Sequence, residues 1–252
     1  MTTMTLEEIK KVAPSVLSTS PSPKVSSKYV FVPTMDIIEN FEKVGWNLAS
    51  VKQSGKDQYG LHELRFRNGE LPKVGDCFVE SVIRNSHNGL ATLSVSSGLH
   101  RLVCSNGLSV PTSMNNKFEL RHMGFDVGEV KRLTDSFADR LPLIQNSVDR
   151  MMDRELNDGE KIIFVKRSMD MRLLNGLKNN EIDIEDILQP KRDGDVGNSL
   201  WKVFNILQEK FVRGGIEYRN DNGRRIGLRG LNNIGSVNYV NTRLWEIAEE
   251  MI

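Results

Sequence analysis

The chain has 252 residues, 38% of them hydrophobic and 27% charged, so it is long enough to bury a substantial core. Its 34 basic and 33 acidic residues give a formal net charge of +1, which excludes the overall basicity of a histone-type binder but allows a local basic patch. The longest apolar runs are too short to cross a membrane, and no apolar segment follows a basic start. We therefore expect a soluble cytoplasmic protein without a membrane partner.

The first 28 residues are expected to form a flexible arm or linker. A short amphipathic stretch, Leu6–Ala13, precedes the Ser- and Pro-rich run Ser18–Pro23, which has few apolar residues. This composition favours a tail or a docking arm.

Residues 29–125 predict a helix followed by a multistranded antiparallel sheet. Thr34 is a good N-cap, and Gly45 suits the left-handed position at which a helix ends. Asn88-Gly89 is a strong signal for a tight turn. Alternation of apolar and polar residues predicts strands at 47–52, 61–67, 77–84, 91–96 and 99–104, with an edge strand at 118–122.

The pattern changes period after the sheet, and residues 126–196 predict a helical layer. Between 127 and 156 apolar residues recur at three- and four-residue steps, and Pro142 marks a kink or break. We expect one long helix, or two, laid on the apolar face of the sheet. Residues 160–177 and 181–188 predict further helices.

Residues 197–252 predict a helix, a β-hairpin and a second helix. The first helix covers 200–211 with Asn198 or Ser199 as its cap, the hairpin pairs 216–219 with 224–229, and the last helix covers 239–251. The predicted fold class is α+β: an N-terminal helix plus an antiparallel sheet covered by long helices, followed by the helix–hairpin–helix.

The sequence offers no enzyme motif, so we expect no catalytic residue, no cofactor and no metal. It lacks a Gly-rich phosphate loop, a Gly-x-Ser-x-Gly elbow and a His-Glu-x-x-His motif. The two cysteines are expected to be buried thiols. None of these residues has the spacing of metal ligands: Cys77, Cys104, His62, His87, His100 and His122.

The predicted C-terminal hairpin is rich in arginine, with only Glu217 and Asp221 as acidic residues between Lys210 and Arg229. One interpretation is a solvated ribbon whose arginines discourage aggregation. The other is a wing that follows a nucleic-acid backbone. The candidate binding residues of this segment are Arg213, Arg219, Arg224, Arg225 and Arg229.

A second candidate surface lies on the predicted sheet, where four arginines fall outside the apolar stripe: Arg65, Arg67, Arg84 and Arg101. They indicate either a solvated face or a surface that holds phosphates and stacks on bases. His87, in Asn85-Ser-His-Asn-Gly89, is expected at a turn tip, where it either shapes the turn or meets a ligand.

Three segments carry a resemblance: Tyr-Val-Phe-Val-Pro-Thr at 29–34, Asn-Ser-His-Asn-Gly at 85–89 and Arg-Leu-Val-Cys-Ser-Asn-Gly at 101–107. In the sequence of these segments the chain resembles a phage/plasmid-like family of unknown function, and the resemblance extends over nearly its whole length. The order of helix, hairpin, strands and long helix also resembles the single-strand annealing proteins of the Red-beta and RecT type. That class forms rings or filaments and holds single-stranded DNA in a basic groove, whereas the sheet region here is nearly charge-balanced.

These observations predict a phage- or plasmid-encoded protein that binds or anneals single-stranded nucleic acid in recombination or replication, as a homo-oligomer and without catalysis. The strand at 118–122 or the N-terminal arm would bridge its subunits. The alternative is a non-enzymatic protein that modulates a host defence or recombination factor.

Overall fold

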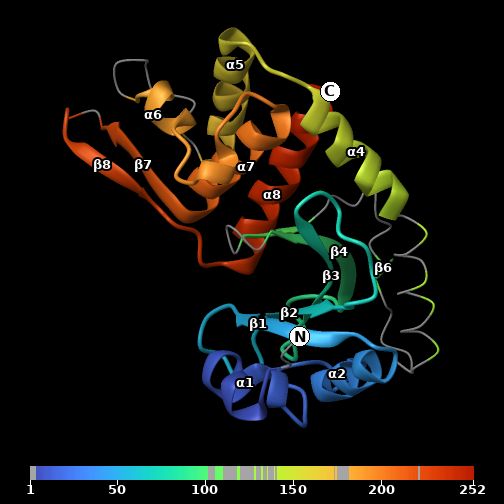
Figure 1. The fold of residues 1–252 in the computed structure, drawn as a ribbon. Coiled ribbons are helices and arrows are strands. Elements are labelled where there is room, and N and C mark those ends of the chain that lie inside the picture. The colour runs from blue at the N-terminus through green and yellow to red at the C-terminus, as the bar shows by residue number, and fades with distance from the viewer. Residues whose placement is uncertain are drawn as a thin grey trace. The chain divides into compact units, whose positions relative to one another are not determined.

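The computed structural model describes residues 4–101, 106–109, 118–119, 128, 132, 135, 139, 141–172, 174, 182–220 and 222–252. The chain divides into two compact units, Met1–Leu102 with Gly107–Pro142, and Val103–Asn106 with Leu143–Ile252. Both contain helices and antiparallel strands, so the α+β fold class is confirmed (Figure 1).

The first unit contains the predicted antiparallel sheet. Its strands follow the order β1-β2-β3-β4-β5, and β6 pairs with β4. Leu64 pairs with Ile83, and Ile83 pairs with Val95, so the apolar side chains of three strands share one face. The bounds are β1 (Asn47–Gln53), β2 (His62–Arg67), β3 (Cys77–Asn85), β4 (Ser94–Arg101), β5 (Asn106–Ser109) and β6 (Phe118–Glu119).

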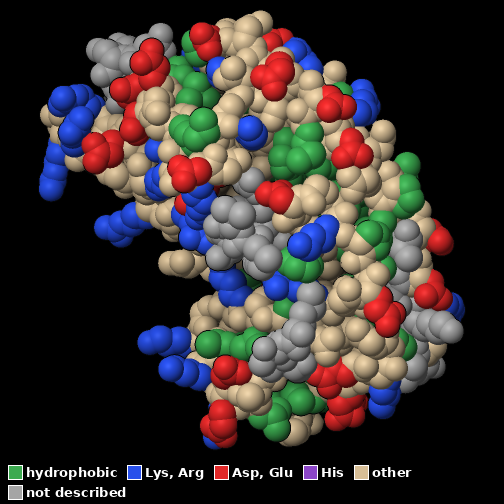
Figure 2. All heavy atoms as spheres, viewed as in Figure 1, with side chains coloured by type: hydrophobic (Ala, Val, Ile, Leu, Met, Phe, Trp, Pro, Cys, Tyr) green, Lys and Arg blue, Asp and Glu red, His purple; other side chains and the backbone are tan. Residues whose placement is uncertain are grey.

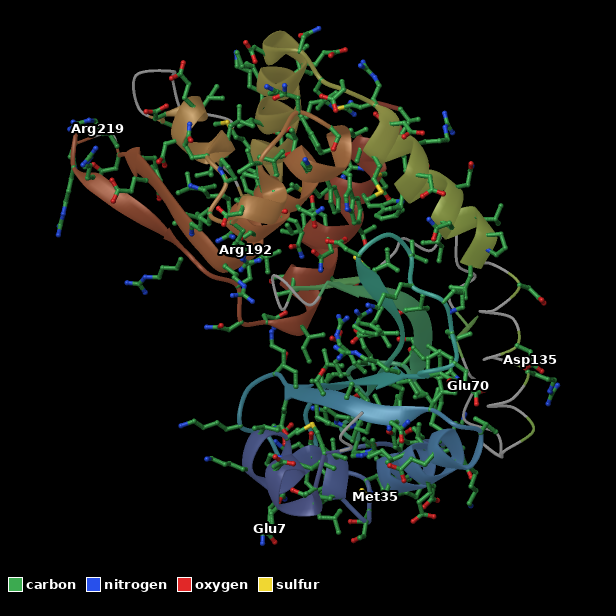
Figure 3. The ribbon with its side chains drawn as sticks, viewed as in Figure 1. Glu7, Met35, Glu70, Asp135, Arg192 and Arg219 are labelled. Atoms are coloured by element: carbon green, nitrogen blue, oxygen red, sulfur yellow. The ribbon has the colours of Figure 1, made fainter. Side chains whose placement is uncertain are left out.

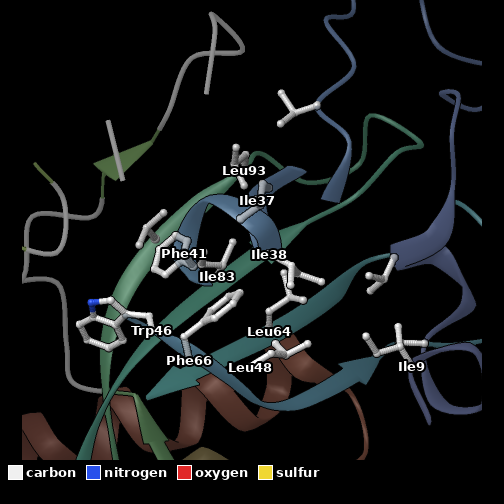
Figure 4. Close-up of a cluster of buried hydrophobic side chains, with 14 residues drawn as sticks. Ile9, Ile37, Ile38, Phe41, Trp46, Leu48, Leu64, Phe66, Ile83 and Leu93 are labelled. Atoms are coloured by element: carbon white, nitrogen blue, oxygen red, sulfur yellow. The ribbon is translucent and has the colours of Figure 1, made fainter. Parts of the chain in front are cut away.

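Three N-terminal elements pack against the apolar face of this sheet: α1 (Leu6–Val12), η1 (Pro14–Leu17) and α2 (Thr34–Lys43). Phe41 of α2 stacks on Phe66 of β2, with ring centroids 4.4 Å apart (Figure 4). Helix α2 begins at Thr34, but the prediction that Thr34 is its N-cap is wrong. Pro33 holds the cap position without a side-chain hydrogen bond, because the Thr34 hydroxyl lies 2.8 Å from His62 Nε2 instead. The predicted cover by residues 127–156 stays a prediction, because most of 127–140 lies outside the described residues.

The prediction of a flexible N-terminal arm is wrong. Ile9, Ala13 and Val16 are buried in the same apolar cluster as the sheet residues. Thr5 and Glu8 form a capping box that starts α1, and the backbone N–H of Met4 donates to Leu48 O at 3.2 Å. Few apolar residues suffice here because the sheet supplies the rest of the core.

The second unit is built around α7 (Leu200–Arg213), whose N-cap is Ser199, one of the two predicted candidates. Trp201 stacks on Phe204, and Phe204 meets the edge of Trp245. Pro142 lies in the first turn of α4, where its missing N–H needs no partner, so it starts this helix. The other elements are α4 (Leu141–Asp153), α5 (Asp158–Met169), η2 (Asp170–Arg172), α6 (Ile184–Leu188), η3 (Asp193–Asp195), β7 (Gly214–Arg219), β8 (Arg225–Arg229) and α8 (Ile234–Glu249).

Helix α8 begins five residues before the predicted helix, at the Asn233 cap, and α5 ends before residue 170, earlier than predicted. In the part of the chain that is described, no helix has both the length and the apolar character needed to cross a membrane.

Candidate nucleic-acid interface

The ribbon formed by β7 and β8 is joined closely to the end of α7. Gly214 has φ +83°, and a Cβ placed on it would lie 2.3 Å from Leu228 O. A Cβ on Gly230 would lie 2.7 Å from Arg213 O. Only glycine fits where the two backbones approach this closely.

Arg172 also holds the end of the ribbon that adjoins α7, which we call the base of the ribbon. Its Nη2 donates to Arg229 O at 2.6 Å, and its Nη1 donates to Phe211 O. Partial burial lowers the pKa of Arg172. One guanidinium therefore links the last turn of α7 to the end of β8.

The predicted turn at the far end of the ribbon is confirmed. Asn220 Oδ1 accepts from Arg224 N at 2.9 Å, and the Gly223 N–H donates to Asn220 O at 2.7 Å. Gly223 has φ +70°, which suits glycine. Arg219 lies at this outer end of the ribbon (Figure 3).

All five arginines predicted for this segment are exposed: Arg213, Arg219, Arg224, Arg225 and Arg229. Arg219 pairs directly with Arg225 across the ribbon, and Arg229 follows on the same face. Figure 2 shows Lys and Arg side chains gathered at the outer end of the ribbon, with Asp and Glu side chains beside them.

Among the described residues of this face, Glu217 is the one carboxylate, and a glycine leaves part of the face without a side chain. Glu217 Oε2 lies 3.5 Å from Arg225 Nη1, and both side chains are exposed. Gly227 shares the face, and a Cβ there would meet nothing within 4 Å. Like charges directly opposite each other destabilise a ribbon, and a bound polyanion would relieve that repulsion. We call Arg219, Arg225 and Arg229, with the flanking Arg213 and Arg224, the ribbon arginines.

The arginines of the sheet have different surroundings, because three of them are held by carboxylates and fit neither the solvated face nor the phosphate-holding surface. Arg65 Nη1 lies 2.9 Å from Glu80 Oε2, and Arg67 Nη2 lies 2.7 Å from Glu80 Oε1. Arg65 and Arg84 both pair with Glu63, at 2.9 and 2.8 Å. Cross-strand register brings these five side chains together, and we call them the sheet ion cluster.

Three of the five side chains of the sheet ion cluster are shielded from water. Glu80 is fully buried, and Glu63 and Arg65 are nearly so. Burial opposes ionisation of Glu63, but Arg65 and Arg84 outweigh it and hold the pKa of that carboxyl below its usual range. Arg101 is not part of this cluster by register, because its backbone pairs with Cys77; its side chain lies outside the described residues.

His87 is fully buried, so its predicted place at an exposed turn tip is wrong. The tip is further along the loop, where Leu90 is 87% exposed. His87 Nε2 and His62 Nε2 lie 3.1 and 2.8 Å from Thr34 Oγ1, and Asn85 Nδ2 donates to the same oxygen at 3.1 Å. The sequence signal for this site is the phase of β2, in which His62 alternates onto the face of Leu64.

The hydrogen bonds fix the protons of this cluster. Gly60 O can only accept, so His62 Nδ1–H donates to it at 3.0 Å and His62 Nε2 accepts from the Thr34 hydroxyl. Thr34 Oγ1 then accepts from His87 Nε2–H. His87 Nδ1 is left unprotonated, and it has no hydrogen-bond partner among the described residues. Burial lowers the pKa of both histidines to about 4.

Within the described residues, no three His, Cys, Asp or Glu side chains are placed to hold a metal ion. The histidine cluster instead joins Thr34 at the start of α2 to the sheet and to Ser15, whose Oγ lies 2.9 Å from His62 Nδ1. It is a buried structural network.

A model of a domain of unknown function (DUF932) matches residues 23–233. The chain belongs to the DUF932 family. Two Escherichia coli (strain K12) proteins resemble this DUF932 chain over 255 residues: UPF0380 protein YafZ at 27% identity and UPF0380 protein YfjQ at 26%, each alignment covering 99% of this chain and 92% of the relative. No solved structure matches. The DUF932 match includes both the sheet ion cluster and the ribbon arginines, and the family name assigns them no role.

Proposed function

We propose that this DUF932 protein binds single-stranded nucleic acid through the ribbon arginines. The observation that carries the proposal is that these arginines are all exposed on one ribbon, which is held firmly where it leaves α7. Glu217 is the one carboxylate among the described residues of their face. Guanidinium groups donate two parallel hydrogen bonds to phosphate, and phosphate contacts supply most of the affinity for nucleic acid.

The sheet ion cluster is left out of the proposed interface. Its arginines already hold carboxylates at 2.7 to 2.9 Å. A phosphate would have to displace Glu63 or Glu80, which would leave a buried carboxylate without its partner.

The wider proposal is a non-enzymatic annealing protein of a phage or plasmid, acting in recombination or replication in the host cytoplasm. Annealing needs many bases presented together, which one ribbon cannot do, so we propose a homo-oligomer. The order of α2, antiparallel sheet and later helices supports the likeness to annealing proteins of the Red-beta and RecT type. In residues 6–17, Ile9, Ala13 and Val16 fill the core of their own unit, whereas Leu6 and Val12 stay exposed.

The test is the triple variant Arg224→Ala, Arg225→Ala, Arg229→Ala, measured with a single-stranded oligonucleotide at several salt concentrations. Each lost phosphate contact should lower the slope of log affinity against log salt by about 0.7, so the triple variant should lose about 2. The matched control is Lys11→Ala, Lys28→Ala, Lys43→Ala, which removes three exposed charges from the first unit.

Unchanged affinity and slope in the ribbon variant would contradict the proposal. Tighter binding of duplex than of single strands would assign the ribbon to duplex, since a two-stranded ribbon also fits a major groove. No binding by the wild type, together with co-purification of a host protein, would favour the modulator of a host factor.

A further inference from the structure

A cleft of about 1440 Å³ lies against the arginine face of the ribbon, within the second unit. Arg219 and Arg225 belong to its lining, and α5, α6 and α7 supply its other walls. Pockets for small molecules usually measure about 300–1,000 Å³, so this cleft is large enough for part of a polymer.

Apolar side chains form much of this lining. Val203 and Ile206 of α7 are almost fully buried beneath it. Ile162 and Val196 also line it, and they remain 38% and 57% exposed. Single exposed apolar residues are ordinary, but here two of them face one cavity whose base is also apolar.

Charged side chains surround this apolar surface, and most carboxylates there are occupied. Asp158 pairs with Lys161 at 3.0 Å and Asp186 with Lys210 at 3.8 Å. Asp183 caps α6 by accepting from two backbone N–H groups. Among the described residues, Lys191 and Arg219 have no carboxylate within 4.0 Å, and Lys191 Nζ lies 3.3 Å from where a Cβ would stand on Gly215. In the described part of the lining, these two cations therefore lack a carboxylate partner, and Glu185 is a carboxylate without a cation partner.

We propose that unpaired bases of the bound strand enter this cleft while the ribbon arginines hold the adjacent phosphates. This inference rests on the proposed function and adds its substrate class: a strand whose bases are not already paired. A nucleotide joins an apolar ring face to an anion, which matches an apolar wall beside guanidinium and ammonium groups. A duplex keeps its bases stacked inside and cannot fill the cleft.

The test compares two probes of equal length and charge, an oligothymidine and an abasic deoxyribose-phosphate oligomer. Wild-type protein should bind the oligothymidine more tightly, because only that probe places bases in the cleft. Ile162→Gln should weaken oligothymidine binding by about five- to tenfold and leave the abasic affinity unchanged. Ile163→Gln is the matched control, since Ile163 is the next residue of α5, is 54% exposed and does not line the cleft.

The outcomes separate the two proposals. Equal wild-type affinity for both probes, or no effect of Ile162→Gln on oligothymidine binding, would overturn the base-binding cleft while leaving the ribbon intact. A parallel loss for both probes in Ile162→Gln would also overturn it, since the change would then act on the ribbon. Failure of the wild type to bind either probe would reject the proposed function itself.

Discussion

Arginine occupies alternating strand positions in β2 and again in β8, yet the two sets have opposite surroundings. Arg65 and Arg67 are held against the fully buried Glu80. Arg225 and Arg229 stand exposed on the ribbon, and Glu217 pairs with Arg225 at 3.5 Å. A buried charge must keep its partner, whereas an exposed one exchanges its partner at little cost. The comparison therefore separates arginines that hold the fold from arginines available to a ligand.

The largest expected effect comes from removing one carboxylate from each region and comparing the loss of stability. Glu80→Gln should lower the free energy of unfolding by about 3–5 kcal/mol, because it removes the fully buried negative charge that pairs with Arg65, which is almost fully buried, and with Arg67, which is partly buried. Glu217→Gln should change it by less than about 1 kcal/mol, since that pair is exposed. Urea unfolding measures both. Equal stability of the two variants would mean that the sheet ion cluster is as solvated as the ribbon.

The dependence of stability on pH tests the buried histidines of the first unit. The folded pKa of His62 is about 4, below its unfolded value of 6.5, so the unfolded chain binds more protons as the pH falls. Stability present above pH 6.5 should decline toward pH 4, by up to about 1.4 kcal/mol per pH unit for this proton. His87, with its pKa also lowered by burial, adds to the slope.

Urea unfolding between pH 6.5 and 4.5 gives this slope. His87→Gln removes one of the two protons, so its stability should depend less steeply on pH than that of the wild type. A wild-type stability that stays flat over this range would mean that the histidines are protonated when folded.

Two glycines test whether the ribbon depends on its base. Gly214→Ala forces a side chain into a left-handed backbone and against Leu228 O, so it should cost about 1–3 kcal/mol and speed amide exchange in residues 214–229. Gly227→Ala is the control, because the space above it is open, and it should stay within about 0.5 kcal/mol of the wild type. Equal exchange in both variants would show that the close approach is dispensable.

The smallest expected effect concerns the facing pair Arg219 and Arg225. Arg219→Thr should raise the free energy of unfolding by about 0.2–1 kcal/mol at low salt, because it removes a like charge directly across the ribbon. The gain should disappear in high salt, where exposed charges are screened. Arg224→Thr, in the turn, has no such facing partner and serves as the control. A loss of stability in Arg219→Thr at low salt would argue against the repulsion.

Local patterns predict most of the fold. The alternation in 61–67 and 77–84, the helix of 200–211 with its Ser199 cap and the ribbon with its turn at 220–223 all follow from short-range periodicity and turn chemistry. The exposure of the ribbon arginines follows from the same local pattern.

The features that the sequence left open depend on contacts between distant segments. Glu63 meets Arg84 through the register of β2 and β3, which is set by the whole sheet rather than by either strand. His87 turns inward because Thr34, 53 residues away, offers its hydroxyl. Residues 6–17 have few apolar side chains, and those that are buried pack in one cluster with residues of the distant sheet.

The hydrogen bond from Met4 to Leu48 gives the N-terminal segment a protective role. β1 ends the strand order of its sheet, and an uncovered edge strand invites strands of other molecules to pair with it. With Ile9 and Ala13 packed against the same sheet, the first residues shield this edge. A chain shortened by its first 13 residues should therefore self-associate through β1, and assemblies of such a chain would be aggregates unrelated to a native oligomer.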